Sequence, residues 1–167
     1  NGEVVAGYDF GNSPFSYTQE KVNGKTVVLT TTNGTKALHL AQKRAYQVLI
    51  GSFLNLDSIC DYLKSQDKNV LLLCAGWKDN FNLEDTLFAG AVVQQLQNDF
   101  TVGDDSSVAA LDMYNLAKDD LRKYLKKSSH NHRLVKLNIE EDVQFCLKLD
   151  VCATIPVLEG EKLVKIS

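Results

Sequence analysis

The residues best suited to chemistry lie where an apolar run ends in small polar residues. The run 27–29 is followed by three threonines (30–32), then by Asn33, Gly34 and Thr35, and a helical pattern begins there. A strand that turns into a helix brings unpaired backbone N–H groups and the positive end of a helix dipole to one point. Such a point suits a phosphate or another anionic group. The commoner alternative for such turns is that Asn33 and Thr35 only cap the helix.

A second stretch repeats this arrangement. The continuous apolar run 70–74 is typical of a strand buried on both faces, and Gly76 follows it closely. Asn82 is a candidate N-cap for the next helix, whose first turn contains Glu84 and Asp85. Adjacent carboxylates are suitable ligands for Mg²⁺, which binds one or two carboxylates together with water and phosphate oxygens. The alternative is that these acids only complement the helix dipole.

Cysteine and histidine offer weaker candidates. Most of the four cysteines lie in apolar surroundings without metal-ligand spacing, which favours buried, reduced thiols; they are Cys60, Cys74, Cys146 and Cys152. Cys74 ends a predicted strand and is a minor candidate nucleophile. His130 and His132 are predicted to lie in a solvated loop after a helix, and His130 is a minor candidate for the rim of the site.

Predicted strands alternate with predicted helices over the first two thirds of the chain. The strands are expected at 27–32, 48–50 and 70–74. Apolar residues at helical spacing predict the helices and form these sets: Ala37, Leu38, Ala41 and Ala45; Leu56, Ile59, Cys60 and Leu63; Leu83, Leu87, Ala91 and Leu96. This alternation predicts an α/β fold, layered α/β/α, with a largely parallel sheet.

The last third is predicted to be helical and to end in a hairpin. A single long helix is expected to run from the turn at 103–107 to Leu125. Residues 138–141 resemble a capping box before a further helix. The segments 154–158 and 162–166 predict a C-terminal β-hairpin, in which Pro156 lies at an edge or an end.

The composition is that of a soluble globular domain. The chain has 167 residues, 44% of them hydrophobic, which suffices for one core. A formal charge of −3 gives no support for nucleic-acid binding. No apolar run is long enough to span a bilayer, so no membrane partner is expected. Together with the reduced cysteines, this favours a cytoplasmic setting.

Several segments, taken in order, resemble the 2-phosphosulfolactate phosphatase family. They are DFGNSP at 9–14, GKTVVLTTTNGT at 24–35, GSFLN at 51–55, CAG at 74–76 and LEDTLFAG at 83–90. Two later segments fit more loosely, at 129–134 and 142–146. The resemblance implies a Mg²⁺-dependent phosphatase that hydrolyses 2-phospho-3-sulfolactate to 3-sulfolactate and phosphate, a step of coenzyme M biosynthesis.

The resemblance and the residue chemistry together assign a candidate site. Glu84 and Asp85 are the predicted catalytic and metal-binding residues. The predicted substrate-binding residues supply hydroxyl, amide or backbone groups, and they are Asn12, Ser13, Thr32, Asn33, Gly34, Thr35, Ser52 and Gly76. The substrate is expected to lie over the carboxyl ends of the parallel strands.

The chain departs from the family pattern at its start. The family has an N-terminal portion with an acidic, Arg-containing motif that has no counterpart here. Residues 1–167 are therefore expected to be a single α/β phosphatase domain or its C-terminal portion, inactive alone, and either self-associated or bound to a retained N-terminal fragment. Two alternatives stay open: a phosphatase of another small phosphorylated hydroxy acid, and a non-catalytic domain that binds phosphoanions or serves assembly.

Overall fold

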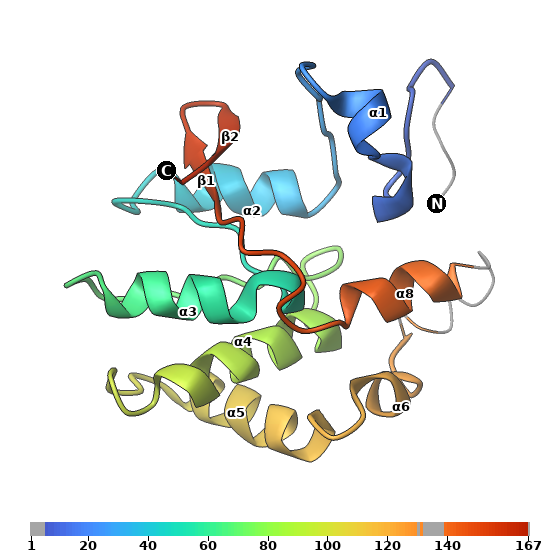
Figure 1. Cartoon of the computed structure of the whole chain (residues 1–167). Coiled ribbons are helices and arrows are strands. Elements are labelled where there is room, and N and C mark those ends of the chain that lie inside the picture. Colours follow the sequence, from blue (N-terminus) through green and yellow to red (C-terminus); the bar gives the residue numbers. More distant parts are fainter. Residues whose placement is uncertain (1–5, 130, 132–138, 167) are drawn as a thin grey trace.

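Helices α3 (Leu56–Lys64), α4 (Leu83–Leu96) and α5 (Asp105–Ala117) lie in a stack that carries the core (Figure 1). The structure is a computed structural model, and it describes residues 6–129, 131 and 139–166. No helix within these ranges has both the length and the apolar character needed to cross a membrane.

Shorter elements surround the stack. The helical ones are η1 (Pro14–Ser16), α1 (Gln19–Val22), α2 (Gly34–Ala41), η2 (Phe53–Asn55), α6 (Leu121–Leu125) and α8 (Glu140–Cys146). The strands β1 (Pro156–Glu159) and β2 (Lys162–Lys165) form the only sheet among the described residues. Figure 1 shows the hairpin, α1 and α2 on one side of α3, and α4 and α5 on the other.

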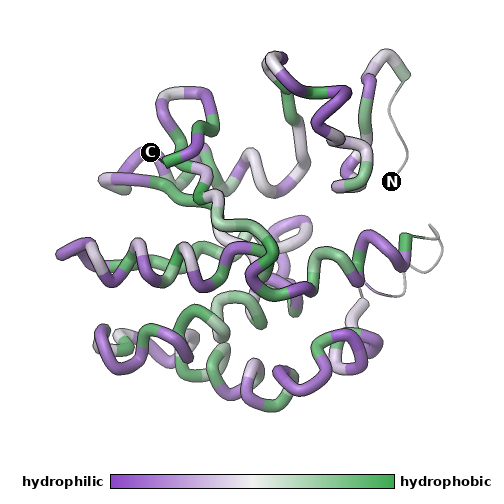
Figure 2. The backbone as a smooth tube through the Cα atoms, viewed as in Figure 1, coloured by the Kyte–Doolittle hydropathy of each residue, from purple (hydrophilic) through white to green (hydrophobic). Residues whose placement is uncertain are grey.

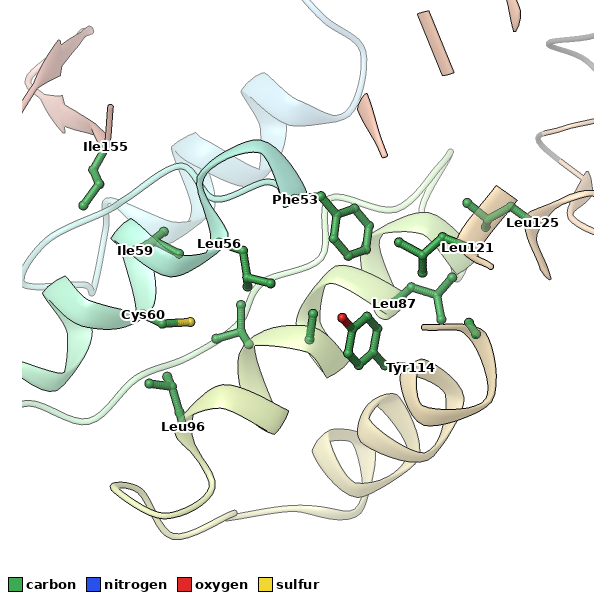
Figure 3. Close-up of a cluster of buried hydrophobic side chains, with 13 residues drawn as sticks. Phe53, Leu56, Ile59, Cys60, Leu87, Leu96, Tyr114, Leu121, Leu125 and Ile155 are labelled. Atoms are coloured by element: carbon green, nitrogen blue, oxygen red, sulfur yellow. The ribbon is translucent and has the colours of Figure 1, made fainter. Parts of the chain in front are cut away.

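The core lies along the stack, where α4 packs between α3 and α5 (Figure 3). Leu87, in the second turn of α4, is fully buried, as is Cys60 of α3. Gly90 allows α4 to approach α5 closely, because a Cβ atom at this position would lie 2.0 Å from the carbonyl oxygen of Ala110. The close packing of α4 on α5 therefore requires glycine at position 90.

The helix predictions are confirmed except at two places. The first helix is shorter than predicted, because α2 ends at Ala41 and Ala45 lies beyond it. Helices form after Asn33, after Asn55 and after Asn82, and Asn82 Oδ1 accepts the N–H of Asp85 at 3.2 Å, as an N-cap does. The prediction of one long helix to Leu125 is wrong, because α5 ends at Ala117. A new helix then begins beyond Asp120, whose Oδ1 accepts the N–H of Lys123 at 2.8 Å.

The C-terminal hairpin is confirmed. β1 and β2 are antiparallel, with Val157 opposite Val164 and Glu159 opposite Lys162. Pro156 is the first residue of β1, where a missing N–H is tolerated. Gly160 in the turn has a φ of 60°, which glycine adopts readily.

The predicted parallel sheet is not shown by the structure. Among the described residues, 27–32 and 70–74 pair with no strand, and Leu49 forms only an isolated antiparallel bridge with Val157. Val28 and Leu71 are 83% and 84% exposed, so the double-sided burial expected of these runs is absent. Figure 2 shows hydrophobic residues in the segment that joins α1 to α2. Apolar β-branched runs become strands only where a neighbouring strand completes the hydrogen-bond ladder.

Two predictions about burial are corrected. All four cysteines are free, but only Cys60 is buried, and Cys74, Cys146 and Cys152 are exposed because their segments lie outside the stack. The solvated loop predicted around His130 and His132 is wrong for Ser128 and Asn131, which are buried, whereas the two histidines lie outside the described residues. The Asn131 side chain accepts from Arg122 Nη1 at 2.7 Å and donates to the carbonyl of Lys126 at 3.2 Å.

An ion pair joins α6 to α8. Arg122 donates to Glu140 through Nε (2.7 Å to Oε1) and through Nη2 (2.5 Å to Oε2). The bonds from Arg122 lower the pKa of the Glu140 carboxyl to about 2 from the ordinary 4.5. Since the pKa is depressed in the folded state, the stabilisation is present above pH 4.5 and is lost as the pH falls towards 2.

Glu140→Gln is therefore expected to reduce the loss of stability between pH 4.5 and pH 2. Urea denaturation at several pH values in this range measures the effect. Glu141→Gln is the matched control, since Glu141 lies in the same helical turn and forms no ion pair among the described residues. Equal pH dependence in the wild type and Glu140→Gln would contradict the role of the pair.

Candidate functional site

A pocket of about 540 Å³ lies between helices α2, α4 and α5 and the loop 72–82. This volume is in the range of small-molecule sites. Apolar side chains form much of its wall. The polar and charged side chains of its lining are Asn33, Lys36, Asp79, Asn80, Asn82, Thr86, Ser106 and Ser107.

A tight turn at residues 77–80 forms one wall of the pocket. Trp77 N–H donates to the carbonyl of Asn80 at 3.1 Å, and Asn80 N–H donates to the carbonyl of Trp77 at 3.0 Å. Lys78 and Asp79 both have positive φ, 52° and 62°. Such a backbone costs a non-glycine residue about 1–2 kcal/mol, so surrounding contacts must hold this turn in place.

Contacts with two helices hold the turn. At its base, Gly76 N–H donates to Asp85 Oδ2 of α4 at 2.8 Å. At its tip, Lys78 N–H donates to Asn33 Oδ1 at 3.1 Å, and Asp79 forms an ion pair with Lys36 of α2. The two stretches that the sequence singled out, 30–35 and 70–85, therefore meet at one pocket.

The predicted anion-binding turn supplies only some of its amides. Thr35 N–H donates to Thr31 Oγ1 at 3.0 Å, and Thr35 Oγ1 donates to the carbonyl of Thr31, so these groups are already engaged. The N–H groups of Gly34 and Lys36 have no acceptor among the described residues. Two backbone donors are thus open at the start of α2, beside the pocket-lining Asn33.

Other predicted substrate-binding residues lie elsewhere. Asn12 and Thr32 are exposed and do not line the pocket. Ser13 Oγ donates to Asp142 Oδ1 of α8 at 2.8 Å. Ser52 N–H donates to Asn55 Oδ1 at 2.8 Å, and Ser52 lines a separate cavity of about 190 Å³.

The two predicted metal-binding carboxylates do not share one partner. Glu84 Oε1 accepts from Ser128 Oγ at 3.0 Å, whereas Asp85 Oδ2 accepts from Gly76 N–H. Within the described part of the chain, no group of three His, Cys, Asp or Glu side chains could hold a metal ion. Asp85, held beside the pocket-lining Gly76, fits Mg²⁺ as a single carboxylate that would be completed by water and substrate oxygens.

Cys74 lines the pocket without the properties of an activated nucleophile. Although the residue is exposed, desolvation by the surrounding pocket atoms raises the pKa of its thiol, and the nearby negative charge of Asp85 raises it further. A raised pKa leaves the thiol protonated near neutral pH, and the thiolate is the nucleophilic form.

The sequence interpretation missed Lys36 and Asp79. Lys36 follows the TTTNGT segment directly, so its place in the first helical turn was a usable signal. Asp79 carried a weaker signal: aspartate tolerates positive φ, but Lys78 beside it does not mark such a turn. Ser106 and Ser107 at the start of α5 were missed as well, because they come into the pocket only through the packing of α5 on α4.

Comparison with known proteins confirms the resemblance. A family model described as 2-phosphosulpholactate phosphatase matches residues 1–161. Proteins named probable 2-phosphosulfolactate phosphatase from Thermotoga petrophila and Thermotoga maritima are 43% and 42% identical over 159 residues, covering 95% of this chain and 67% of each relative. A protein of the same name from Synechocystis is 43% identical and is covered to 66%. The chain spans about two thirds of the length of these relatives, and it belongs to the 2-phosphosulfolactate phosphatase family of phosphoric monoester hydrolases.

Proposed function

We propose that this chain carries the substrate site of an enzyme that hydrolyses 2-phospho-3-sulfolactate to 3-sulfolactate and phosphate, as a step of coenzyme M biosynthesis. Family membership supports the reaction class. The location of the site rests on the hydrogen bond between Lys78 N–H and Asn33 Oδ1. This bond joins the family segment 24–35 to the loop that follows the family segment 74–76, at the 540 Å³ pocket.

The proposed chemistry uses the open donors of α2. Water adds to phosphorus, the bond between phosphorus and the C2 oxygen breaks, and the leaving alkoxide takes up the proton that the attacking water loses. The N–H groups of Gly34 and Lys36, at the positive end of the helix dipole, bind the phosphoryl oxygens and stabilise their charge. The apolar wall formed by Leu72, Met113 and their neighbours limits access of water to the rest of the substrate.

Magnesium dependence is part of the same proposal, and Asp85 is the residue that would hold the ion. The bound cation would neutralise charge on the phosphoryl group. Gly76 N–H orients the Asp85 carboxylate by its hydrogen bond. Glu84, engaged by Ser128, is proposed to contribute its charge rather than a shared ligand position.

Asp85→Asn is expected to raise the Mg²⁺ concentration for half-maximal turnover about tenfold or more, since it removes the charge but keeps an acceptor for Gly76 N–H. Glu84→Gln is expected to have a smaller effect. Titration of Mg²⁺ in a phosphate-release assay measures both, and thermal melting reports any loss of fold. Unchanged Mg²⁺ dependence in Asp85→Asn would contradict a metal-binding role and leave Asp85 only the hydrogen bond to Gly76 that holds the turn.

The proposed substrate is tested by phosphate release from 2-phospho-3-sulfolactate, phospholactate and phosphoglycerate, with the Thermotoga maritima relative assayed in parallel. We expect preferred turnover of the sulfonated substrate. Preference for phospholactate or phosphoglycerate would assign the chain to another phosphorylated hydroxy acid. Binding of these compounds without phosphate release would support a non-catalytic anion-binding domain.

A further inference from the structure

We infer that Lys36 is the cation through which this pocket binds the negative charge of its substrate, and that Asp79 is a built-in competitor which substrate must displace. The inference rests on the proposed function, because it concerns the same pocket and the same class of ligand. It assigns a specificity role to two residues.

Charge in the pocket is confined to one pair. Among the described residues that line it, only Lys36 and Asp79 are charged, and they form an ion pair with each other. Lys78 does not line the pocket, and its Nζ lies 4.6 Å from the centroid of the Trp77 ring. An anionic substrate entering the pocket therefore meets one ammonium group that a carboxylate already occupies.

The fold delivers Asp79 to this position. Asp79 lies at the tip of the turn 77–80 with a φ of 62°, and the hydrogen bond from Lys78 N–H to Asn33 holds that tip against the start of α2. Lys36 lies in the first turn of α2. Its own backbone N–H group and that of Gly34 are open in the same turn. An anion that takes the place of the Asp79 carboxylate would thus reach the Lys36 ammonium group, close to the positive end of the α2 dipole.

Exchange of the partner is energetically accessible. The side chains of Lys36 and Asp79 are 55% and 77% exposed, and ion pairs that face solvent contribute little net stability. A phosphate monoester carries about two negative charges near neutral pH, whereas the Asp79 carboxylate carries one. Coulomb attraction grows with charge at equal distance, so a phosphate displaces Asp79 and a monoanion does so poorly.

Asp79 therefore makes the pocket selective for anions that carry two negative charges. The carboxylate excludes small monoanions, which gain too little from Lys36 to replace it, and admits the doubly charged phosphoryl group. Such discrimination against the wrong ligand by a repulsive group is a common source of specificity.

Equilibrium binding of inorganic phosphate and of acetate, measured by calorimetric titration, tests this inference without turnover. Lys36→Met is expected to weaken phosphate binding about tenfold or more, and Lys36→Arg to retain most of it. Asp79→Asn is expected to tighten phosphate binding a few-fold, about two to five, and to tighten acetate binding by a larger factor.

Lys64→Met and Asp61→Asn are the matched controls. This pair on α3 is also exposed, at 37% and 78%, and does not line the pocket, so both variants should bind phosphate as the wild type does. Circular dichroism melting verifies that every variant is folded.

The inference is overturned if the wild type binds no phosphate, if Lys36→Met binds it as the wild type does, or if Asp79→Asn weakens binding. The last result would make Asp79 a positioning residue for Lys36. Phosphate release from 2-phospho-3-sulfolactate separates this from the proposed function. If the variants bind phosphate as expected but the protein releases no phosphate from the substrate, the inference holds and the proposed function is rejected. If the protein turns the substrate over but Lys36→Met binds phosphate as the wild type does, the function holds and the inference is rejected.

Discussion

Gly90→Ala is expected to destabilise the protein by about 3 kcal/mol or more. A Cβ atom at this position would lie 2.0 Å from the carbonyl oxygen of Ala110 and 2.8 Å from Cβ of Tyr114. Both neighbours belong to α5, and one is backbone, so no side-chain rotation relieves the contact. Helix α4 would have to move away from α5 and open the core around Leu87. Urea denaturation followed by circular dichroism measures the loss.

Gly103→Ala is the matched control for this substitution. A Cβ atom at Gly103 would meet nothing within 4 Å, and this glycine lies outside the helical stack. The free energy of unfolding of Gly103→Ala is expected to stay within about 0.5 kcal/mol of the wild-type value. If Gly90→Ala were as stable as Gly103→Ala, the close packing of α4 on α5 described here would be incorrect.

Gly76→Ala is expected to lower phosphatase turnover about a hundredfold. Gly76 has a φ of 68°, and a Cβ atom there would lie 2.7 Å from the carbonyl oxygen of Asn80. That oxygen accepts the N–H of Trp77, so the turn 77–80 would open. The contacts of the turn with Asn33 and Lys36 would be lost with it, and the pocket wall would move. Steady-state phosphate release measures the effect.

Gly160→Ala separates backbone strain from the loss of the site. Gly160 has a φ of 60°, but a Cβ atom there meets nothing within 4 Å, and the residue lies in the turn between β1 and β2. Both variants place alanine in the left-handed backbone region, which costs conformational energy. Only in Gly76→Ala does the new Cβ atom also meet the carbonyl of Asn80. Equal turnover in the two variants would show that the turn 77–80 does not shape the active site.

The sequence predicted the helices better than the strands, for a physical reason. Helix hydrogen bonds close within one segment, so apolar spacing and a capping residue such as Asn82 suffice to define α4. The runs 27–32 and 70–74 have the composition of strands, but a strand also needs a partner, which the sequence pattern of one segment does not contain. The C-terminal hairpin was predictable because its partner follows within a few residues.

The candidate site was predicted in part. The segments around Asn33 and Gly76 were identified from their residue types, and the structure brings both to one pocket. Ser13 and Ser52 instead form bonds to Asp142 and Asn55, which spacing alone does not reveal. The ion pair between Lys36 and Asp79 joins residues 43 positions apart in the chain, so it depends on the strained turn that only the structure shows.

The location of bound product tests the central claim most directly. A crystal structure of the protein soaked with 3-sulfolactate and phosphate should place an anionic group about 3 Å from the N–H groups of Gly34 and Lys36, inside the pocket that Asn33 lines. Density for the product in the smaller cavity beside Ser52, or at any place that leaves the start of α2 without an anion, would contradict the account.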